Sequence, residues 1–245
     1  MVVRAPASSD MARRVRVTGG RGRFAYGDDV ELRVSNDPAS AAARWLARRL
    51  ADAVRRRDRA FIAVSGGSSA PALFDAVTAL EVPWDRIEVW QVDERVAPDG
   101  DPGRNAGQLA VLPAVVHLMP VTASDLAGAA HRYGRSLPER FDVVHLGLGD
   151  DGHTASWPPG DPVVDSGRPC EVVGVFNGFE RMTLTPPVVN AARSRLMLTH
   201  GASKAPLLER WLLRDPSLPV DRVRRSGTWT FADPAAVTDL PHVAG

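Results

Sequence analysis

Short apolar runs alternate with amphipathic stretches along most of the chain. The runs predict strands at 60–64, 86–92, 114–121, 141–149, 170–176 and 194–201, and the stretches predict helices near 71–80, 124–137, 186–193 and 202–213. Apolar strands separated by helices are typical of a mostly parallel sheet with helices on both faces. The sequence therefore predicts a Rossmann-like α/β fold, in which ligands bind beyond the carboxyl ends of the strands.

A longer helix is predicted to begin at Asp37-Pro38, which offers an N-cap followed by a first-turn proline. An apolar residue then recurs every four positions, at Ala42, Leu46, Leu50 and Val54. Arg55-Arg56-Arg57 closes the pattern. Cations at a helix C-terminus favour the helix dipole, so a solvated face is preferred over an anion-binding patch.

Size and composition favour one globular domain. The chain has 245 residues, 44% of them hydrophobic, which is enough for a full core. Residues 1–12 are polar and unpatterned and are expected to form a flexible tail, leaving 13–245 as a single α/β domain.

The charge balance limits the possible partners. Lys plus Arg number 30 against 29 for Asp plus Glu, so no overall field favours nucleic acid or an acidic membrane. No apolar run approaches the roughly 18 residues of a membrane span, and no apolar signal segment follows the N-terminal Arg13-Arg14. Cys170 is the lone cysteine, which fits a reducing compartment. We therefore expect a cytoplasmic protein.

The loop after the strand at 60–64 is a candidate phosphate cradle. It reads Ser-Gly-Gly-Ser-Ser-Ala-Pro from Ser65 to Pro71, and a predicted helix follows. Backbone N–H groups in such a loop can point at an anion, and the helix N-terminus adds positive potential. The loop lacks the Gly-Lys-Ser/Thr ending of a nucleoside-triphosphate site, and an ordinary glycine-containing turn is the alternative.

Charged residues follow the next strand directly. Asp93, Glu94 and Arg95 stand at the predicted mouth of the sheet. They can be a solvated loop, but an arginine in a cleft is well suited to stabilise a developing oxyanion.

The stretch His-Leu-Gly-Leu-Gly-Asp-Asp-Gly-His contains the glycine spacing of a dinucleotide-binding turn, at Gly147, Gly149 and Gly152. The motif lies past the middle of the chain, and Asp150 and Asp151 would repel a pyrophosphate. A dinucleotide site is therefore disfavoured.

Asp151 and His153 are instead candidates for acid/base chemistry. Histidine titrates nearest neutrality, and a neighbouring carboxylate can orient the ring. The same pair could ligate a metal, but no further ligands stand at a recognisable spacing, so no metal is expected. His145 and His117 lie within predicted strands and are expected to be core or hydrogen-bonded residues.

Two cations later in the chain are candidates for holding a phosphate. Arg181 precedes one predicted strand segment, and Lys204 stands near the start of a helix that follows another strand. A cation is unfavourable at a helix N-terminus unless an anion lies between it and the dipole. Arg181 and Lys204 are therefore predicted to converge on one phosphate.

Taken together, these segments resemble the 6-phosphogluconolactonase family. The resemblance spans about residues 30–232 and rests on ordered blocks: SGGSSAP, VDERVAPDGDPGRN, FDVVHLGLGDDGHTAS, RMTLTPPVVNAAR and GASKAPLLERWL. It implies hydrolysis of 6-phosphoglucono-1,5-lactone in the oxidative pentose phosphate pathway. It also implies a fold shared with glucosamine-6-phosphate deaminase and ribose-5-phosphate isomerase, without metal or other cofactor.

The resemblance assigns roles to the candidate residues. His153 would be the general base with Asp151 beside it, and Arg95 would stand near the reacting carbonyl. The residues implied to bind the substrate phosphate are Ser65, Gly66, Gly67, Ser68, Arg181 and Lys204. The family has a Ser-Asn pair where Arg104-Asn105 stand here, so Arg104 could add a cation to the site.

Two alternatives remain open on the sequence. One is an isomerase or deaminase of aldose or amino-sugar phosphates on the same fold, and the other is a non-catalytic sugar-phosphate sensor. The expected partner is a small phosphorylated sugar lactone, with no nucleic acid and no membrane. The expected state is a monomer or weak homo-oligomer.

Overall fold

The computed structural model describes residues 15–17, 23–26 and 30–240. The predicted tail at 1–12 lies outside these residues, and the single domain over 13–245 stays a prediction. No helix in the described ranges is long and apolar enough to cross a membrane.

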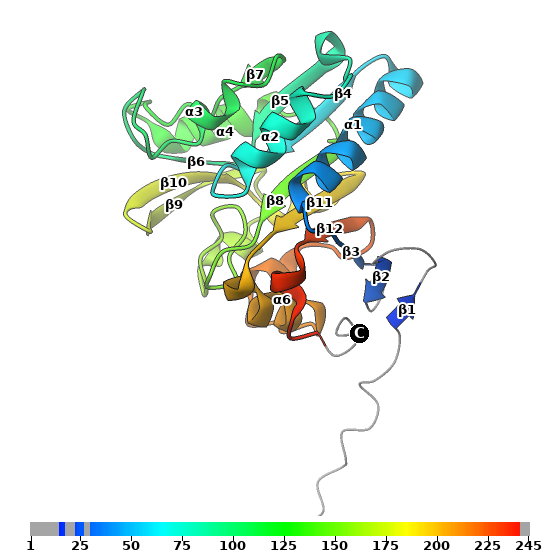
Figure 1. Cartoon of the computed structure of the whole chain (residues 1–245). Coiled ribbons are helices and arrows are strands. Elements are labelled where there is room, and N and C mark those ends of the chain that lie inside the picture. Colours follow the sequence, from blue (N-terminus) through cyan, green and yellow to red (C-terminus); the bar gives the residue numbers. More distant parts are fainter. Residues whose placement is uncertain (1–14, 18–22, 27–29, 241–245) are drawn as a thin grey trace, which may run out of the picture.

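A nine-stranded sheet forms the centre of the molecule (Figure 1). Its spatial order is β1 (Val15–Val17), β2 (Arg23–Tyr26), β3 (Val30–Val34), β12 (Thr228–Ala232), β11 (Ser194–Thr199), β8 (Val143–Gly147), β4 (Ala60–Val64), β5 (Ile87–Gln91) and β7 (Val115–His117). All pairs from β3 to β7 are parallel, and β1 and β2 add an antiparallel edge. The mostly parallel sheet predicted from the apolar runs is confirmed.

A second sheet is antiparallel and has three strands, in the order β6 (Asp93–Arg95), β10 (Phe179–Leu184) and β9 (Cys170–Phe176). In Figure 1 these strands lie together at the left of the view, away from α1. The strand predicted at 170–176 is confirmed, but it belongs to this sheet rather than to the parallel one. Two details of the sequence analysis were wrong, because Asp93 to Arg95 form a strand rather than a loop and Arg181 lies inside β10.

Helices connect the parallel strands and cover both faces of the large sheet. They are α1 (Pro38–Arg57), α2 (Ala70–Thr78), α3 (Ala106–Leu109), α4 (Leu126–Ser136), α5 (Pro186–Ala191) and α6 (Ala205–Leu212). Shorter 3-10 turns lie at Trp84–Arg86, Pro162–Asp165, Ala202–Lys204, Pro219–Arg222 and Pro234–Val237. The predicted helices are present within a few residues of their expected ends, whereas α3 was not predicted.

Helix α1 begins as its sequence predicts. The Asp37 side chain accepts a hydrogen bond from Ser40 N at 2.9 Å, which satisfies one free donor of the first turn. Ala42, Leu46 and Leu50 are buried. The arginine run at the other end is not uniformly solvated, because Arg57 Nη2 binds the buried Asp142 Oδ1 at 2.5 Å.

Two hydrophobic clusters lie against the sheets. In one, α1 and α2 pack side by side over one face of the large sheet, with Leu50 and Phe74 fully buried (Figure 1). In the other, α4 packs on β9 and α6 packs on the 3-10 turns Ala202–Lys204 and Pro234–Val237, and Trp157 and Trp211 are both 0% exposed. The loops at the carboxyl ends of the parallel strands are therefore joined to strands and helices that are fixed by core packing.

The two strand histidines behave as predicted. His145 in β8 is 0% exposed and meets the Phe74 ring edge-on, and burial lowers the pKa of His145 to about 4. His117 in β7 stacks on Trp90 with ring centroids 4.0 Å apart, and its Nε2 lies 2.9 Å from Glu88 Oε2. Neither histidine lines the cavity described below.

Candidate active site

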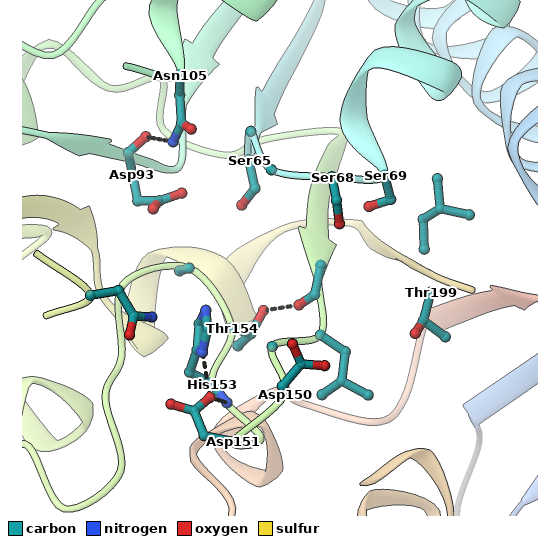
Figure 2. A pocket seen from close by; sticks show the side chains of 18 of the residues that line it. Ser65, Ser68, Ser69, Asp93, Asn105, Asp150, Asp151, His153, Thr154 and Thr199 are labelled. Atoms are coloured by element: carbon teal, nitrogen blue, oxygen red, sulfur yellow. Dashed lines mark hydrogen bonds and ion pairs between the residues drawn. The ribbon is translucent and has the colours of Figure 1, made fainter. Parts of the chain in front are cut away.

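A cavity of about 480 Å³ opens at the carboxyl ends of β4, β8 and β11, beside the antiparallel sheet. Figure 2 shows its interior, with Ser65, Ser68 and Ser69 on one side and Asp150, Asp151 and His153 on the opposite side. Every residue that the sequence singled out as catalytic or phosphate-binding lines this cavity: Ser65, Gly66, Gly67, Ser68, Arg95, Asp151, His153, Arg181 and Lys204. The fold thus brings together groups that lie far apart in the sequence.

The loop from Ser65 to Ser69 joins β4 to α2. Ser65 N donates to His145 O at 3.1 Å, and Gly67 N donates to Gln108 Oε1 at 3.0 Å. The N–H groups of Gly66, Ser68 and Ser69 make no hydrogen bond with the described residues. Three backbone donors therefore remain for a ligand, although Gly67, which was predicted to approach the phosphate, donates elsewhere.

Glycine and an unpaired hydroxyl shape this loop further. A Cβ on Gly66 would lie 2.2 Å from Asn105 Oδ1, so only glycine fits beside that side chain. The Ser65 hydroxyl is buried and makes no hydrogen bond with the described residues. An unsatisfied buried hydroxyl costs free energy unless a ligand or water completes it, which supports a polar ligand at this loop.

His153 is held by Asp151. Its Nδ1 contacts Asp151 Oδ1, and its backbone N donates to the same oxygen at 3.0 Å. Burial raises the pKa of Asp151, but these hydrogen bonds outweigh burial and leave that pKa below its usual value. The carboxylate is therefore ionised at neutral pH, and it engages Nδ1 so that Nε2 is the nitrogen left for a ligand.

The glycines around His153 explain the dinucleotide-like spacing. A Cβ on Gly149 would lie 2.0 Å from His153 Nδ1, so the imidazole needs the bare backbone there. Gly149 N donates to His153 O at 2.8 Å, and Gly152 has φ +84°, a left-handed conformation that favours glycine. These glycines fold the loop around its own histidine rather than around a nucleotide.

Arg95 approaches the cavity from β6. Its Nη1 donates to Gly103 O at 2.9 Å and contacts Asn105 Oδ1. Asn105 Nδ2 donates in turn to Asp93 O at 2.9 Å (Figure 2). The buried Nε of Arg95 has no hydrogen-bond partner in the described part of the chain. The guanidinium is thus fixed in direction while keeping a donor free.

The buried carboxylate of Glu94 holds the backbone on which Arg95 and Asn105 stand. Its carboxylate is 0% exposed and accepts from the backbone N of Arg95, Asn105 and Ala106 at 2.7–2.8 Å. Arg104 does not line the cavity: it is 6% exposed and its Nε lies 3.5 Å from Glu94 Oε2. Arg104 therefore braces the loop and does not add a cation to the described cavity wall.

Arg181 faces Arg95 across the antiparallel pair of β10 and β6. Its Nη1 lies 3.9 Å from the buried Asp93 Oδ2, which also accepts from Ser156 Oγ at 2.8 Å. Burial raises the pKa of Asp93, while the Ser156 hydrogen bond and the two arginines oppose this. Asp93 therefore offsets part of the positive charge that Arg95 and Arg181 bring into the cavity.

Lys204 stands at the N-cap of α6, as the sequence predicted, and an anion does lie beside it. That anion is the side chain of Asp150, whose Oδ1 is 2.5 Å from Lys204 Nζ. Arg181 and Lys204 thus line one cavity with different carboxylate partners. Their convergence on a single phosphate stays a prediction.

Several polar lining residues were not assigned a site role from the sequence: Asp93, Asn105, Thr154, Asn177, Thr199 and His200. Thr199 and His200 lie at the carboxyl end of β11. They could have been predicted from the sequence, because ligands of such sheets bind beyond the carboxyl ends of the strands. Asn105 and Asn177 lie on connections whose path depends on the antiparallel sheet. The Asn177-Gly178 pair is a local signal for a β-turn, but it does not indicate that the turn lies beside the cavity.

The site combines a carboxylate-oriented imidazole, two arginines, a lysine and a hydroxyl-rich loop at strand ends. This combination defines a class of α/β protein that binds a small anionic substrate and has the groups for acid/base chemistry. The described residues contain no group of three or more His, Cys, Asp or Glu side chains placed to hold a metal ion.

Comparison with known proteins places the chain more closely. A family model described as glucosamine-6-phosphate isomerases/6-phosphogluconolactonase matches residues 34–231, and the chain belongs to this family. It is 33% identical over 253 aligned positions to a 6-phosphogluconolactonase of Streptomyces coelicolor, covering 87% of this chain and 96% of that one. A 6-phosphogluconolactonase of Synechocystis is 35% identical over 174 positions, covering 64% and 72%.

Solved structures confirm the fold. A 6-phosphogluconolactonase from Shewanella baltica superposes with a TM-score of 0.76 at 22% identity, covering 85% of this chain and 99% of that chain. A monomeric glucosamine-6-phosphate deaminase superposes with a TM-score of 0.75 at 18% identity, covering 86% and 99%. The predicted relation between these two kinds of enzyme is therefore a shared architecture.

Proposed function

We propose that this protein is a 6-phosphogluconolactonase, which hydrolyses 6-phosphoglucono-1,5-lactone to 6-phosphogluconate in the oxidative pentose phosphate pathway. The observation that carries the proposal is the Asp151–His153 pair, which faces the serine loop across one cavity that Arg95 also lines (Figure 2). The relatives that match over most of their length are named for this activity.

The proposed reaction is direct attack of water on the lactone carbonyl. His153 Nε2 removes a proton from the water as its oxygen bonds to the carbonyl carbon, while Asp151 holds the proton on Nδ1 and stabilises the imidazolium. The guanidinium of Arg95 stabilises the oxyanion that forms. The tetrahedral intermediate then collapses, the ring C–O bond breaks, and the His153 proton passes to the leaving ring oxygen.

The phosphate would be held at the other side of the cavity. The free N–H groups of the Ser65–Ser69 loop, the Ser65 and Ser68 hydroxyls and the start of α2 offer donors. Arg181 and Lys204 supply positive charge. The sugar ring would then span from this loop to His153.

The deciding experiment is a lactone hydrolysis assay on the wild type and on H153A. The wild type is expected to accelerate lactone opening well above the spontaneous rate. H153A is expected to lose roughly two to four orders of magnitude in kcat, the usual contribution of a general base. A folded H153A with wild-type turnover would exclude the mechanism, and a wild type without activity would exclude the function.

Deamination or isomerisation of an amino-sugar phosphate is the alternative reaction, because the family description includes glucosamine-6-phosphate isomerases and a glucosamine-6-phosphate deaminase shares the fold. An assay for ammonia release from glucosamine 6-phosphate separates the two reactions. We expect no release above background.

A further inference from the structure

The hairpin between β9 and β10 contributes Asn177 and Arg181 to the lining of the cavity, and its tip is a two-residue turn. Strand β9 ends at Phe176, and β10 begins at Phe179. The two residues between them, Asn177 and Gly178, have φ of +50° and +83°, which is the pattern of a type I′ turn. The turn sets the pairing of Phe176 with Phe179, and a register shift follows between Phe179 and Arg181. Phe176 therefore has a defined place beside the cavity.

The ring of Phe176 packs against the proposed general base. The His153 and Phe176 ring centroids lie 5.0 Å apart with an interplanar angle of 87°, an edge-to-face contact. The bare backbone of Gly149 also meets the imidazole, where a Cβ would come within 2.1 Å of Cε1. Gly149 and Phe176 therefore restrain the ring, while Asp151 restrains its rotation.

The same phenylalanine also contacts Arg181. The guanidinium carbon of Arg181 lies 5.2 Å from the Phe176 ring centroid, a cation–π distance. Arg181 Nε donates to the backbone oxygen of Phe176 at 2.9 Å. One hairpin residue thus touches both the base and a candidate phosphate ligand.

Phe176 stands outside the two hydrophobic clusters of the described residues. It is half-buried. Its ring makes an aromatic contact with His153 and a cation–π contact with Arg181.

We propose that Phe176 is a positioning residue, which holds the His153 imidazole and the Arg181 guanidinium in their working orientations from the tip of the β9–β10 hairpin. The proposal rests on the proposed lactonase function. It assigns a kinetic role to a residue that does not itself line the cavity and carries no ionisable group.

The test compares F176A, F176L and F176Y with the wild type in the lactone assay. V175A is the matched control, because Val175 is the neighbouring residue of β9 and is 78% exposed. We expect F176A to lose about 10- to 100-fold in kcat, because a displaced catalytic group loses its reactive geometry. F176L, which keeps apolar bulk without the ring, should lose kcat in part. F176Y and V175A should stay within about threefold of the wild type.

A second measurement reports positioning without turnover. Long-range ¹H–¹⁵N spectra of the histidine rings are expected to show altered or broadened His153 signals in F176A and F176L, while His145 signals are unchanged. Calorimetry should show that F176A binds 6-phosphogluconate several-fold more weakly, because the Arg181 guanidinium loses the ring that holds it.

The outcomes separate the proposals. Wild-type kcat in a folded F176A, or in F176L if F176A does not fold, overturns the role of Phe176 and leaves the lactonase function standing. Unchanged His153 signals in these variants also overturn it. An inactive wild type, by contrast, overturns the function itself.

Discussion

The parallel and antiparallel sheets contribute to the site in different ways. The parallel sheet supplies loops: the serine loop follows β4, the His153 loop follows β8, and Lys204 follows β11. The antiparallel sheet supplies strand residues, since Asp93 and Arg95 lie in β6 and Arg181 lies in β10. Loops can be shaped by glycine around a ligand or a histidine, whereas strand residues hold charges at fixed spacings.

This difference also shows in how the charges are held. Glu94 lies within β6, and its buried carboxylate accepts from the backbone N of Arg95, so the backbone that carries this cation is held in place. Asp150, in a loop after β8, is 79% exposed where it pairs with Lys204. The charged groups of the antiparallel side are therefore expected to be preorganised, whereas Lys204 is expected to exchange the Asp150 carboxylate for an anionic substrate.

Of the three substitutions that test this contrast, R95M on the antiparallel side is expected to have the largest effect. Loss of one donor to an oxyanion costs roughly 10²- to 10³-fold in kcat, while methionine keeps most of the side-chain volume. Steady-state kinetics of lactone hydrolysis measure this, with circular dichroism as the check on folding. A rise in KM with kcat unchanged would assign Arg95 to substrate binding instead and remove the contrast between the two sheets.

A smaller effect is expected for G149A, on the parallel side. The added Cβ would overlap the His153 ring, which must move away and lose its alignment with Asp151. We expect about a 10- to 100-fold loss in kcat with little change in KM. G174A is a suitable control, because a Cβ at Gly174 meets no heavy atom within 4 Å. Equal activity of G149A and wild type would show that the loop tolerates the ring in another position.

The smallest effect is expected for D150N. Exposed ion pairs contribute about 0–1 kcal/mol, so freeing Lys204 from the Asp150 carboxylate should lower KM by at most about fivefold and leave kcat unchanged. Measuring KM in low and high salt checks the electrostatic origin, because salt screens the pair. A higher KM in D150N would mean that Asp150 orients Lys204 for the substrate rather than competing with it.

Much of the parallel side could be predicted from the sequence. Its strands are apolar runs, and its candidate site residues lie shortly after those runs, with Ser65 immediately after β4 and His153 in the loop after β8. The antiparallel side was predicted less well. Strand β6 is three residues long and carries Asp93, Glu94 and Arg95, so no hydrophobic pattern marks it. Its pairing with β10 joins segments more than 80 residues apart, at Arg95 and Arg181.

The sequence by itself determined the fold class, the loop chemistry and the identity of the candidate base, because apolar periodicity, glycine placement and the Asp151–His153 spacing are local. Tertiary structure alone decided which groups meet. It placed Arg181 against Asp93, gave Lys204 the carboxylate of Asp150 as its partner, and set Phe176 beside His153. These contacts join segments that are far apart in the chain, and which segments meet depends on how the strands of the two sheets pair.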